Sequence, residues 1–198
     1  MVKKTVFNDQ TFVQRNSGLF VPHKGQIIAS TPAVGKTFVG NNYEGVLDLS
    51  ARKFFEAEYQ EGQKRSVYEK SKVIDYYTNQ DYPHNYIDAI VENQSSYELV
   101  LTAFLADMVL RPDFTKEYND RLDYLIALPK LSSLERIFER MVKRGNNREF
   151  INLFKYLYPI ILEKFGHQSN CITIEDGEFL EDTLIRHKLI AQDVSQAH

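Results

Sequence analysis

Five short apolar runs, separated by stretches of helical character, constrain the fold of this 198-residue chain more than any other feature. The runs are residues 26–30, 46–49, 97–104, 124–128 and 171–174. The stretches of helical character are residues 65–77, 85–92, 148–165 and 178–188, with a further helix that begins at Ser132. Short buried strands that alternate with helices favour a parallel sheet covered on both faces. The sequence therefore predicts an α/β fold, a three-layer arrangement of about five parallel strands with helices on both sides.

Composition and charge exclude several classes of protein. Apolar residues make up 43% of the chain and charged residues 26%, which is typical of an ordinary globular domain and not of a disordered chain. The single cysteine, Cys171, cannot form an intramolecular disulfide, and we expect a cytoplasmic protein. No apolar run approaches the length of a membrane span, so no membrane partner is expected. With 24 basic and 27 acidic residues, the net charge of −3 indicates no nucleic-acid partner.

The first predicted strand runs directly into a turn whose residues carry the main functional signal. These residues are Ser30, Thr31, Pro32, Ala33, Val34, Gly35, Lys36 and Thr37. The pattern Gly-Lys-Thr between a strand and a helix is typical of a phosphate-binding loop. Gly35 allows the main chain to approach phosphates, Lys36 supplies a positive charge, and Thr37 offers a hydroxyl to Mg²⁺. We therefore expect ATP and Mg²⁺ as ligands, with Thr37 at the metal.

Ser30 departs from this pattern, because the first position of the loop is normally glycine. A serine fits there if its φ angle is negative. The alternative interpretation is a plain strand-to-helix turn with no ligand.

Three further segments carry a resemblance to a known family. They are residues 46–54, with Asp48 and Arg52, residues 81–87, with His84, and residues 134–154, with Arg144-Gly145-Asn146-Asn147. Together with the loop, they resemble small P-loop kinases of the nucleoside-monophosphate-kinase type, including uncharacterised phage-encoded members. The resemblance covers residues 25 to about 180. It implies an ATP-dependent kinase fold, with residues 25–198 as the kinase-like domain. Residues 1–24, which are mixed in polarity, are expected to form an N-terminal arm or hairpin.

The same resemblance implies where the acceptor binds. Asp48 would lie at the carboxyl end of a strand beside the loop and take part in catalysis and acceptor binding, with Arg52 and His84 as further acceptor contacts. Other interpretations remain open. Asp48 could cap the next helix, Arg52 could be a solvated surface charge, and His84 could simply pack or face water.

Residues 130–148 are strongly basic in an otherwise acidic chain and are predicted to form a helical lid. The segment has six basic and two acidic residues, and Arg136, Arg140 and Arg144 share one face of a helix. Arginines that close over a transferring phosphoryl group stabilise its charge, so Arg140 and Arg144 are candidate catalytic residues. The alternative is a solvated basic face. We expect a capping box from Ser132 at the start of the helix and Gly145 at its end.

One element of a competent kinase is missing from the sequence. The third predicted strand, residues 97–104, ends without a carboxylate, although Asp107 follows shortly after. Three functions therefore remain open. The first is a kinase that phosphorylates a nucleotide, nucleoside or similar small molecule. The second is a catalytically weak nucleotide-binding regulatory or inhibitory protein that acts through a protein partner, and the third is a nucleotide hydrolase.

Overall fold

The fold is described from a computed structural model of the chain. The structure describes residues 13–15, 18–20, 25–51, 54, 67–69, 72–74 and 81–191. Arg52 lies outside the described residues, so its predicted contact with the acceptor stays a prediction.

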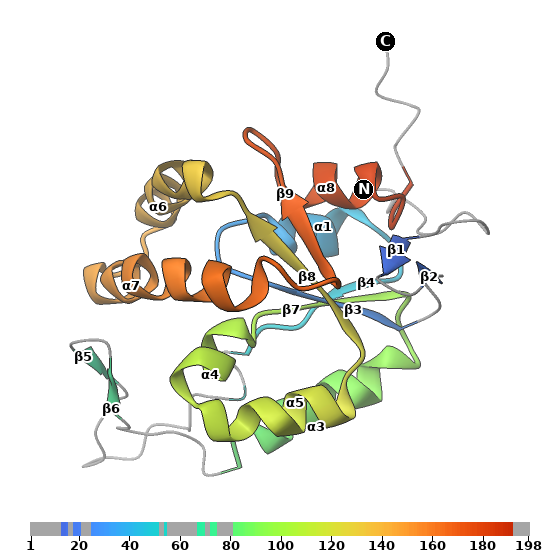
Figure 1. The fold of residues 1–198 in the computed structure, drawn as a ribbon, viewed down its shortest axis with the longest axis horizontal. Helices are drawn as coiled ribbons and strands as arrows, with labels where there is room; N and C mark the ends of the chain where they lie inside the picture. The colour runs from blue at the N-terminus through green and yellow to red at the C-terminus, as the bar shows by residue number, and fades with distance from the viewer. Residues whose placement is uncertain are drawn as a thin grey trace.

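A five-stranded parallel sheet forms the centre of the molecule (Figure 1). Its strands, in spatial order, are β4 (Val46–Asp48), β7 (Leu99–Thr102), β3 (Gln26–Ser30), β8 (Tyr124–Pro129) and β9 (Cys171–Ile174). Each neighbouring pair is parallel, with β3 in the middle between β7 and β8. The predicted α/β fold with helices on both faces is confirmed. Because all carboxyl ends of the strands share one edge, the loops that follow them are brought together there.

Helices cover both faces of the sheet (Figure 1). On one face lie α1 (Lys36–Asn42) and α8 (Leu180–Arg186), and on the other α3 (His84–Gln94), α4 (Leu105–Leu110) and α5 (Thr115–Arg121). The helices α6 (Leu134–Lys143) and α7 (Arg148–Phe165) lie side by side at one end of the molecule. Two short 3-10 turns, η1 (Pro112–Phe114) and η2 (Leu131–Ser133), lead into α5 and α6.

The central strand β3 shows why the sheet is buried on both sides. Ile27 and Ala29 contribute to the core beneath α3, α4 and α7, whereas Ile28 faces the core beneath α1 and α8. All three side chains are fully buried. Side chains alternate between the two faces of a strand, so a continuous apolar run is what a central parallel strand requires.

Two strand pairs lie apart from the central sheet. β1 (Val13–Arg15) pairs antiparallel with β2 (Gly18–Phe20), and β5 (Val67–Glu69) pairs antiparallel with β6 (Lys72–Ile74). The β5–β6 pair contradicts the helix predicted for residues 65–77. Val67 pairs with Ile74 and Tyr68 with Val73, so β-branched and aromatic residues favour the extended pairing over the helical one.

Of the two predictions about the ends of α6, one is confirmed and one is wrong. The predicted stop at Gly145 is confirmed, because Gly145 has a φ of 75° and Asn146 N donates to Met141 O at 3.1 Å. The predicted capping box is wrong: the helix begins at Leu134 after Ser133, without a side-chain cap. The hydroxyl groups of Ser132 and Ser133 donate instead to Asp176, a partner distant in sequence.

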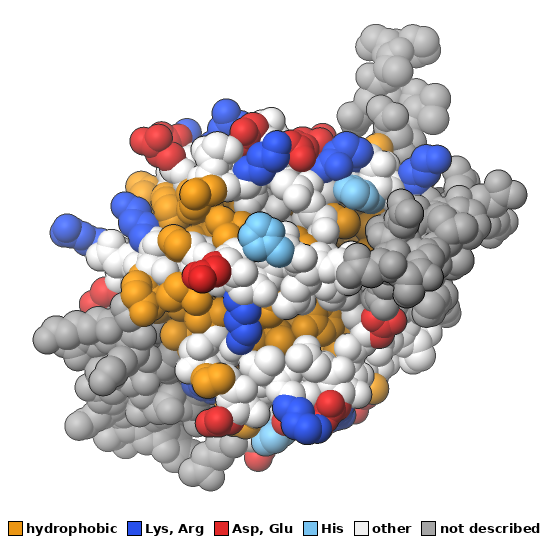
Figure 2. Space-filling view, viewed as in Figure 1, with side chains coloured by type: hydrophobic (Ala, Val, Ile, Leu, Met, Phe, Trp, Pro, Cys, Tyr) orange, Lys and Arg blue, Asp and Glu red, His pale blue; other side chains and the backbone are white. Residues whose placement is uncertain are grey.

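In the described part of the chain, no helix combines the length and apolarity needed to cross a bilayer. On the face shown in Figure 2, basic and acidic side chains are interspersed along the edge over α6 and α8. Hydrophobic side chains gather over the region of α6 and α7 in the same view.

Candidate functional site

The loop after β3 begins at a serine that the structure accommodates without strain. Ser30 is almost fully buried, and its hydroxyl donates to the carbonyl oxygen of Ala127 on β8 at 2.6 Å. Ser30 is not among the described residues with a positive φ angle. Because its backbone is not left-handed, the position does not require the glycine of the usual pattern. The serine therefore ties the first residue of the loop to the neighbouring strand.

Two left-handed residues turn the loop back on itself. Ala33 has a φ of 62° and Gly35 a φ of 106°, and α1 begins directly afterwards at Lys36. A left-handed conformation between right-handed ones directs consecutive backbone N–H groups into one concavity, which suits an anion. This turn lies between the central strand β3 and α1, at the carboxyl edge of the parallel sheet.

The lysine of the loop is bound within the loop itself. Lys36 Nζ donates to the carbonyl oxygen of Thr31 at 2.6 Å. Burial lowers the pKa of Lys36 to about 8; the Asp48 carboxylate opposes this shift, and the Arg144 guanidinium adds to it. A buried ammonium group of this kind is stabilised when an anion enters, because the anion compensates for the water that the amine has lost.

Thr37 and Asp48 form the second polar feature of the site. Thr37 Oγ1 donates to Asp48 Oδ2 at 2.7 Å, which brings the start of α1 to the end of β4. Gly40 makes this close approach possible: a Cβ atom there would lie 3.0 Å from the Asp48 Cβ. The pair unites the two residues that the sequence pattern singled out for metal and acceptor.

The pair also fits what Mg²⁺ requires from a protein. It offers one hydroxyl and one carboxylate, which are hard oxygen donors. Within the described residues, no group of three or more His, Cys, Asp or Glu side chains could hold a metal ion alone. Mg²⁺ in phosphoryl-transfer sites is usually held by one or two protein oxygens, with phosphate oxygens and water completing the shell. Thr37 and Asp48 therefore fit a metal that arrives with a phosphate ligand.

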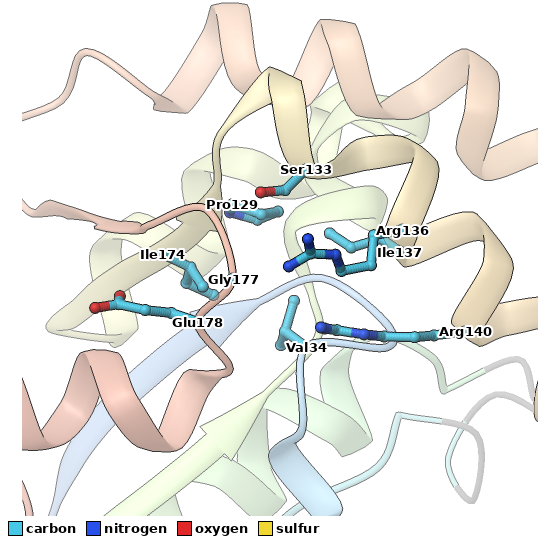
Figure 3. Close-up of a pocket in the computed structure, with 9 residues that line it drawn as sticks. All are labelled: Val34, Pro129, Ser133, Arg136, Ile137, Arg140, Ile174, Gly177 and Glu178. Atoms are coloured by element: carbon cyan, nitrogen blue, oxygen red, sulfur yellow. The ribbon is translucent and has the colours of Figure 1, made fainter.

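Arginines from α6 face the loop (Figure 3). Arg136 and Arg140 point from α6 into a pocket between Val34 of the loop and Gly177 of the segment after β9. The Arg140 guanidinium carbon lies 3.8 Å from the centre of the Phe179 ring. Phe179 is 45% exposed, and a Cβ at Gly35 would be 3.6 Å from its ring. A stacked cation and ring thus lie directly beside the turn after β3.

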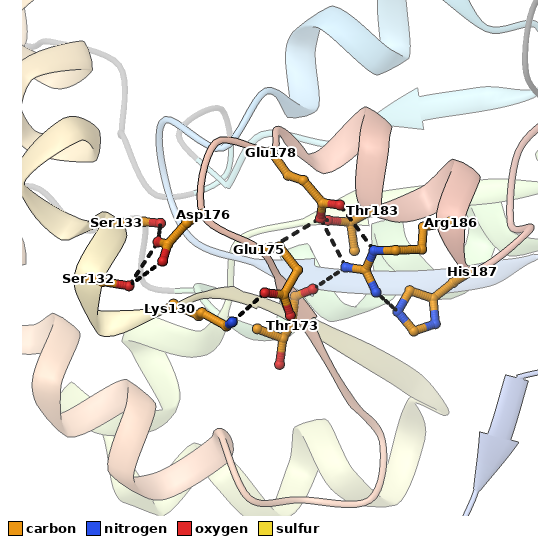
Figure 4. A network of polar contacts seen from close by, with 10 residues as sticks. All are labelled: Lys130, Ser132, Ser133, Thr173, Glu175, Asp176, Glu178, Thr183, Arg186 and His187. Atoms are coloured by element: carbon orange, nitrogen blue, oxygen red, sulfur yellow. Dashed lines mark hydrogen bonds and ion pairs between the residues drawn. The ribbon is translucent and has the colours of Figure 1, made fainter.

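The far wall of this pocket is fixed by ion pairs and hydrogen bonds (Figure 4). Asp176 accepts from Ser132 at 2.8 Å and from Ser133 at 2.6 Å. Arg186 binds Glu178 at 2.9 Å and, as the largest influence, lowers the pKa of that carboxyl group to about 2. The Asp176 contacts attach the segment after β9 to the turn that precedes α6, and the Arg186–Glu178 pair attaches it to α8, so the pocket has a defined shape.

His84, predicted to contact an acceptor, is already engaged with α5. It lies at the start of α3, and its Nδ1 contacts Glu117 Oε1 at 2.9 Å. Its ring meets Phe114 edge-on, with the ring centres 5.7 Å apart. A role in acceptor binding would require His84 to exchange this partner.

Asp107, the alternative acid near the third strand, is also engaged. It follows β7 on α4 and accepts a hydrogen bond from the Tyr82 hydroxyl. Burial raises the pKa of Asp107 to about 6, against the opposing effects of Tyr82 and Arg111. To hold a metal ion, Asp107 would have to give up the hydrogen bond that it accepts from Tyr82.

Two residues of the site escape prediction from the sequence. Phe179 stacks on Arg140, and Tyr158 of α7 shares a hydrogen bond with Thr31. The aromatic stretch around Tyr158 is typical of core packing, and no local pattern singles out either residue. Both act on the loop from more than 100 residues away in sequence, which only the fold reveals.

Comparison with known proteins gives limited information. No family model matches the chain, and no curated protein matches it. The crystal structure of a gluconokinase from Sinorhizobium meliloti 1021 is similar, with a TM-score of 0.47 and 16% sequence identity. The match covers 85% of this chain and 91% of that one. A likeness at this level carries no argument about function, so the site must be judged by its own geometry.

Proposed function

We propose that the chain binds ATP on residues 30–37 and transfers its terminal phosphoryl group to a small-molecule acceptor, most simply a nucleotide or nucleoside. The proposal depends on one observation, which is the environment of Lys36 in a turn with two left-handed residues. Its half-buried amine donates to the loop's own Thr31 carbonyl, and no carboxylate of the described residues pairs with it directly. An ammonium group held in this way favours a polyanion in front of it.

Each neighbouring residue has a proposed role in the transfer. Lys36 would neutralise the charge of the terminal phosphates, and Arg144 would add to the positive field around Lys36. Arg140 would contribute charge from the pocket side. Thr37 and Asp48 would hold Mg²⁺, which supplies charge neutralisation when bound together with ATP. Asp48, at the carboxyl end of β4, would also orient the acceptor, whose attacking oxygen displaces ADP.

The proposed place of the nucleobase is the pocket between α6 and the segment after β9. Arg140 lines this pocket, and its guanidinium stacks on the ring of Phe179 beside it, so a base would stack on the outer face of one of these two groups. The pocket is lined by Val34, so a base there would be continuous with phosphates in the loop.

A second candidate function is a nucleotide-binding regulatory protein with little or no turnover. The end of β7 favours this alternative. Thr102 uses its hydroxyl to bond the carbonyl oxygen of Ile28, and the nearby Asp107 is bound by Tyr82. The strand next to the loop therefore offers no unbound carboxylate of the kind that holds metal in many such proteins. A protein partner would then carry the biological effect.

Turnover with a panel of acceptors distinguishes these functions. The purified protein, with ATP and Mg²⁺, is expected to release ADP with at least one nucleoside or nucleoside monophosphate, and sugars and sugar acids form a second arm of the panel. ADP release is followed by a coupled assay, with reactions lacking acceptor as the control for hydrolysis. ATP binding without turnover on any acceptor would support the regulatory function and overturn the kinase. ADP release that does not depend on an acceptor would indicate a hydrolase.

Raising the pH is expected to weaken ATP binding. In the free protein Lys36 loses its proton as pH rises through about 8, whereas in the unfolded chain it stays protonated to the ordinary lysine value. Only the protonated amine attracts phosphate, so affinity should fall about tenfold between pH 7 and pH 9. Between pH 8 and pH 10 the unfolded chain keeps the Lys36 proton that the folded chain has lost. Because the unfolded chain then binds more protons, the free energy of unfolding should rise toward pH 10. Calorimetric titration at a series of pH values measures the first effect and urea unfolding the second. A constant affinity over this range would contradict the role of Lys36.

A further inference from the structure

Thr31 is the point at which the loop is attached to the rest of the molecule. It follows β3 directly and is 1% exposed. Its hydroxyl shares a hydrogen bond with the hydroxyl of Tyr158, which is fully buried on α7. Its carbonyl oxygen accepts the hydrogen bond from Lys36 Nζ. Thr31 therefore connects two parts of the site: its side chain contacts α7, and its main-chain carbonyl contacts Lys36.

Ala33 makes a second attachment to the same pair of helices. It packs in a cluster with side chains of α6 and α7, namely Ile137, Met141, Ile151, Phe154 and Tyr158. Its left-handed φ of 62° is unfavourable for a residue with a Cβ atom, so the surrounding packing must hold it in place. The loop is thus fixed to α6 and α7 at two points.

The helices that hold the loop also carry the basic residues of the site. Arg140 and Arg144 are at the C-terminal end of α6, and the Arg140 charge lowers the pKa of Tyr158, opposing the effect of burial. The Phe138 ring of α6 contacts the Tyr158 ring edge-on, with the ring centres 6.0 Å apart. Tyr158 therefore lies between the loop and the arginine-bearing helix, in contact with both elements.

We propose that Tyr158 is a positioning residue: through Thr31 it fixes the phosphate loop to α6 and α7, so that the backbone amides, Lys36 and the two arginines keep one arrangement for a triphosphate. The proposal deepens the proposed function and rests on it only where nucleotide affinity is concerned. The positioning itself is a property of the free protein. It predicts that the hydroxyl of Tyr158, and not only the ring, matters to the loop.

The test uses Tyr158→Phe and Thr31→Val, alone and combined, with Tyr124→Phe as a matched control. The Tyr124 hydroxyl bonds Asn119 Oδ1 at 2.7 Å at the amino end of β8, away from the loop. Each single change at the Tyr158–Thr31 pair is expected to weaken ATP binding about tenfold, and the double change no further, because both remove the same hydrogen bond. Amide hydrogen exchange of residues 33–37 without ligand should become faster in these variants and stay unchanged in Tyr124→Phe.

The possible outcomes separate this inference from the proposed function. The inference is overturned if Tyr158→Phe keeps the loop exchange and ATP affinity of the wild type and lowers the urea midpoint only as much as Tyr124→Phe does. Tyr158 would then be a core residue and no more. Additive effects of the two single changes would also overturn it. If the wild type does not bind ATP while loop exchange rises locally in Tyr158→Phe, the proposed function fails and the positioning role stands.

Discussion

Replacing Lys36 by alanine is expected to lower ATP affinity at least about a hundredfold and to abolish ADP release. Lys36 is half-buried, and no other side chain of the turn carries a charge. The fold should persist, because burial disfavours the charged amine and its removal leaves behind only a backbone carbonyl. Calorimetric titration with ATP and Mg²⁺ measures the loss, and urea unfolding checks that the fold is retained.

Lys116→Ala is the matched control for this experiment. Lys116 lies on α5 and pairs with Asp120 one turn further on, with 83% of its side chain exposed. Its removal should leave both ATP affinity and stability nearly unchanged. Equal ATP affinity in Lys36→Ala and Lys116→Ala would show that the turn after β3 does not bind phosphate.

Replacing Gly35 by alanine is expected to damage the same loop through its backbone. Gly35 has a φ of 106°, which side chains rarely adopt, whereas the added Cβ would meet the Phe179 ring at an ordinary 3.6 Å. The cost is therefore backbone strain, about 1–3 kcal/mol of unfolding free energy. The turn should relax this strain by rotating its amides, so we expect ATP affinity to fall at least about tenfold, as measured by calorimetry.

Gly45→Ala separates strain in the loop from strain in general. Gly45 has a φ of 76° just before β4, at the opposite end of the sheet, and its Cβ would meet Glu98 at 3.4 Å. A comparable loss of stability with full ATP affinity is expected for this variant. Were Gly35→Ala to bind ATP as tightly as Gly45→Ala, the conformation of the turn would be irrelevant to binding.

The central strand and the helix ends could be predicted because their causes are local. The strand Gln26–Ser30 has the predicted bounds, since a continuous β-branched run bounded by turn residues fits only a strand buried on both faces. Gly145 ends α6 because a left-handed residue is needed there. The contact between Thr37 and Asp48 agrees with the place beside the loop that the resemblance implied for Asp48, because both residues lie at the carboxyl edge of the sheet.

Features that depend on distant partners could not be predicted. Ser132 looked like a helix cap, but Asp176, 44 residues further on, offers it a stronger charged acceptor. The helices α4 and α5 were not predicted. The first is short and mostly apolar, the second is short and mostly polar, and neither shows a clear helical period. Tyr158 reaches the loop across 127 positions of sequence, and no pattern near either residue reveals the contact.

Residues 130–148 were predicted to form a lid, and the structure shows that α6 and α7 pack directly against the loop. Ala33 packs against side chains of α6 and α7, and Thr31 shares a hydrogen bond with Tyr158 of α7. Closure of residues 130–148 over a substrate therefore stays a prediction, as do the roles of Arg140, Arg144 and His84 and the domain boundary at residue 25.

A crystal structure with a non-hydrolysable ATP analogue and Mg²⁺ tests the phosphate loop most directly. The expected result is a triphosphate within hydrogen-bond distance of the amides of residues 33–37, with Lys36 Nζ moved from the Thr31 carbonyl to phosphate oxygens. A structure in which Lys36 still bonds Thr31 and no analogue lies in the turn at millimolar concentration would contradict the proposed phosphate binding by this loop.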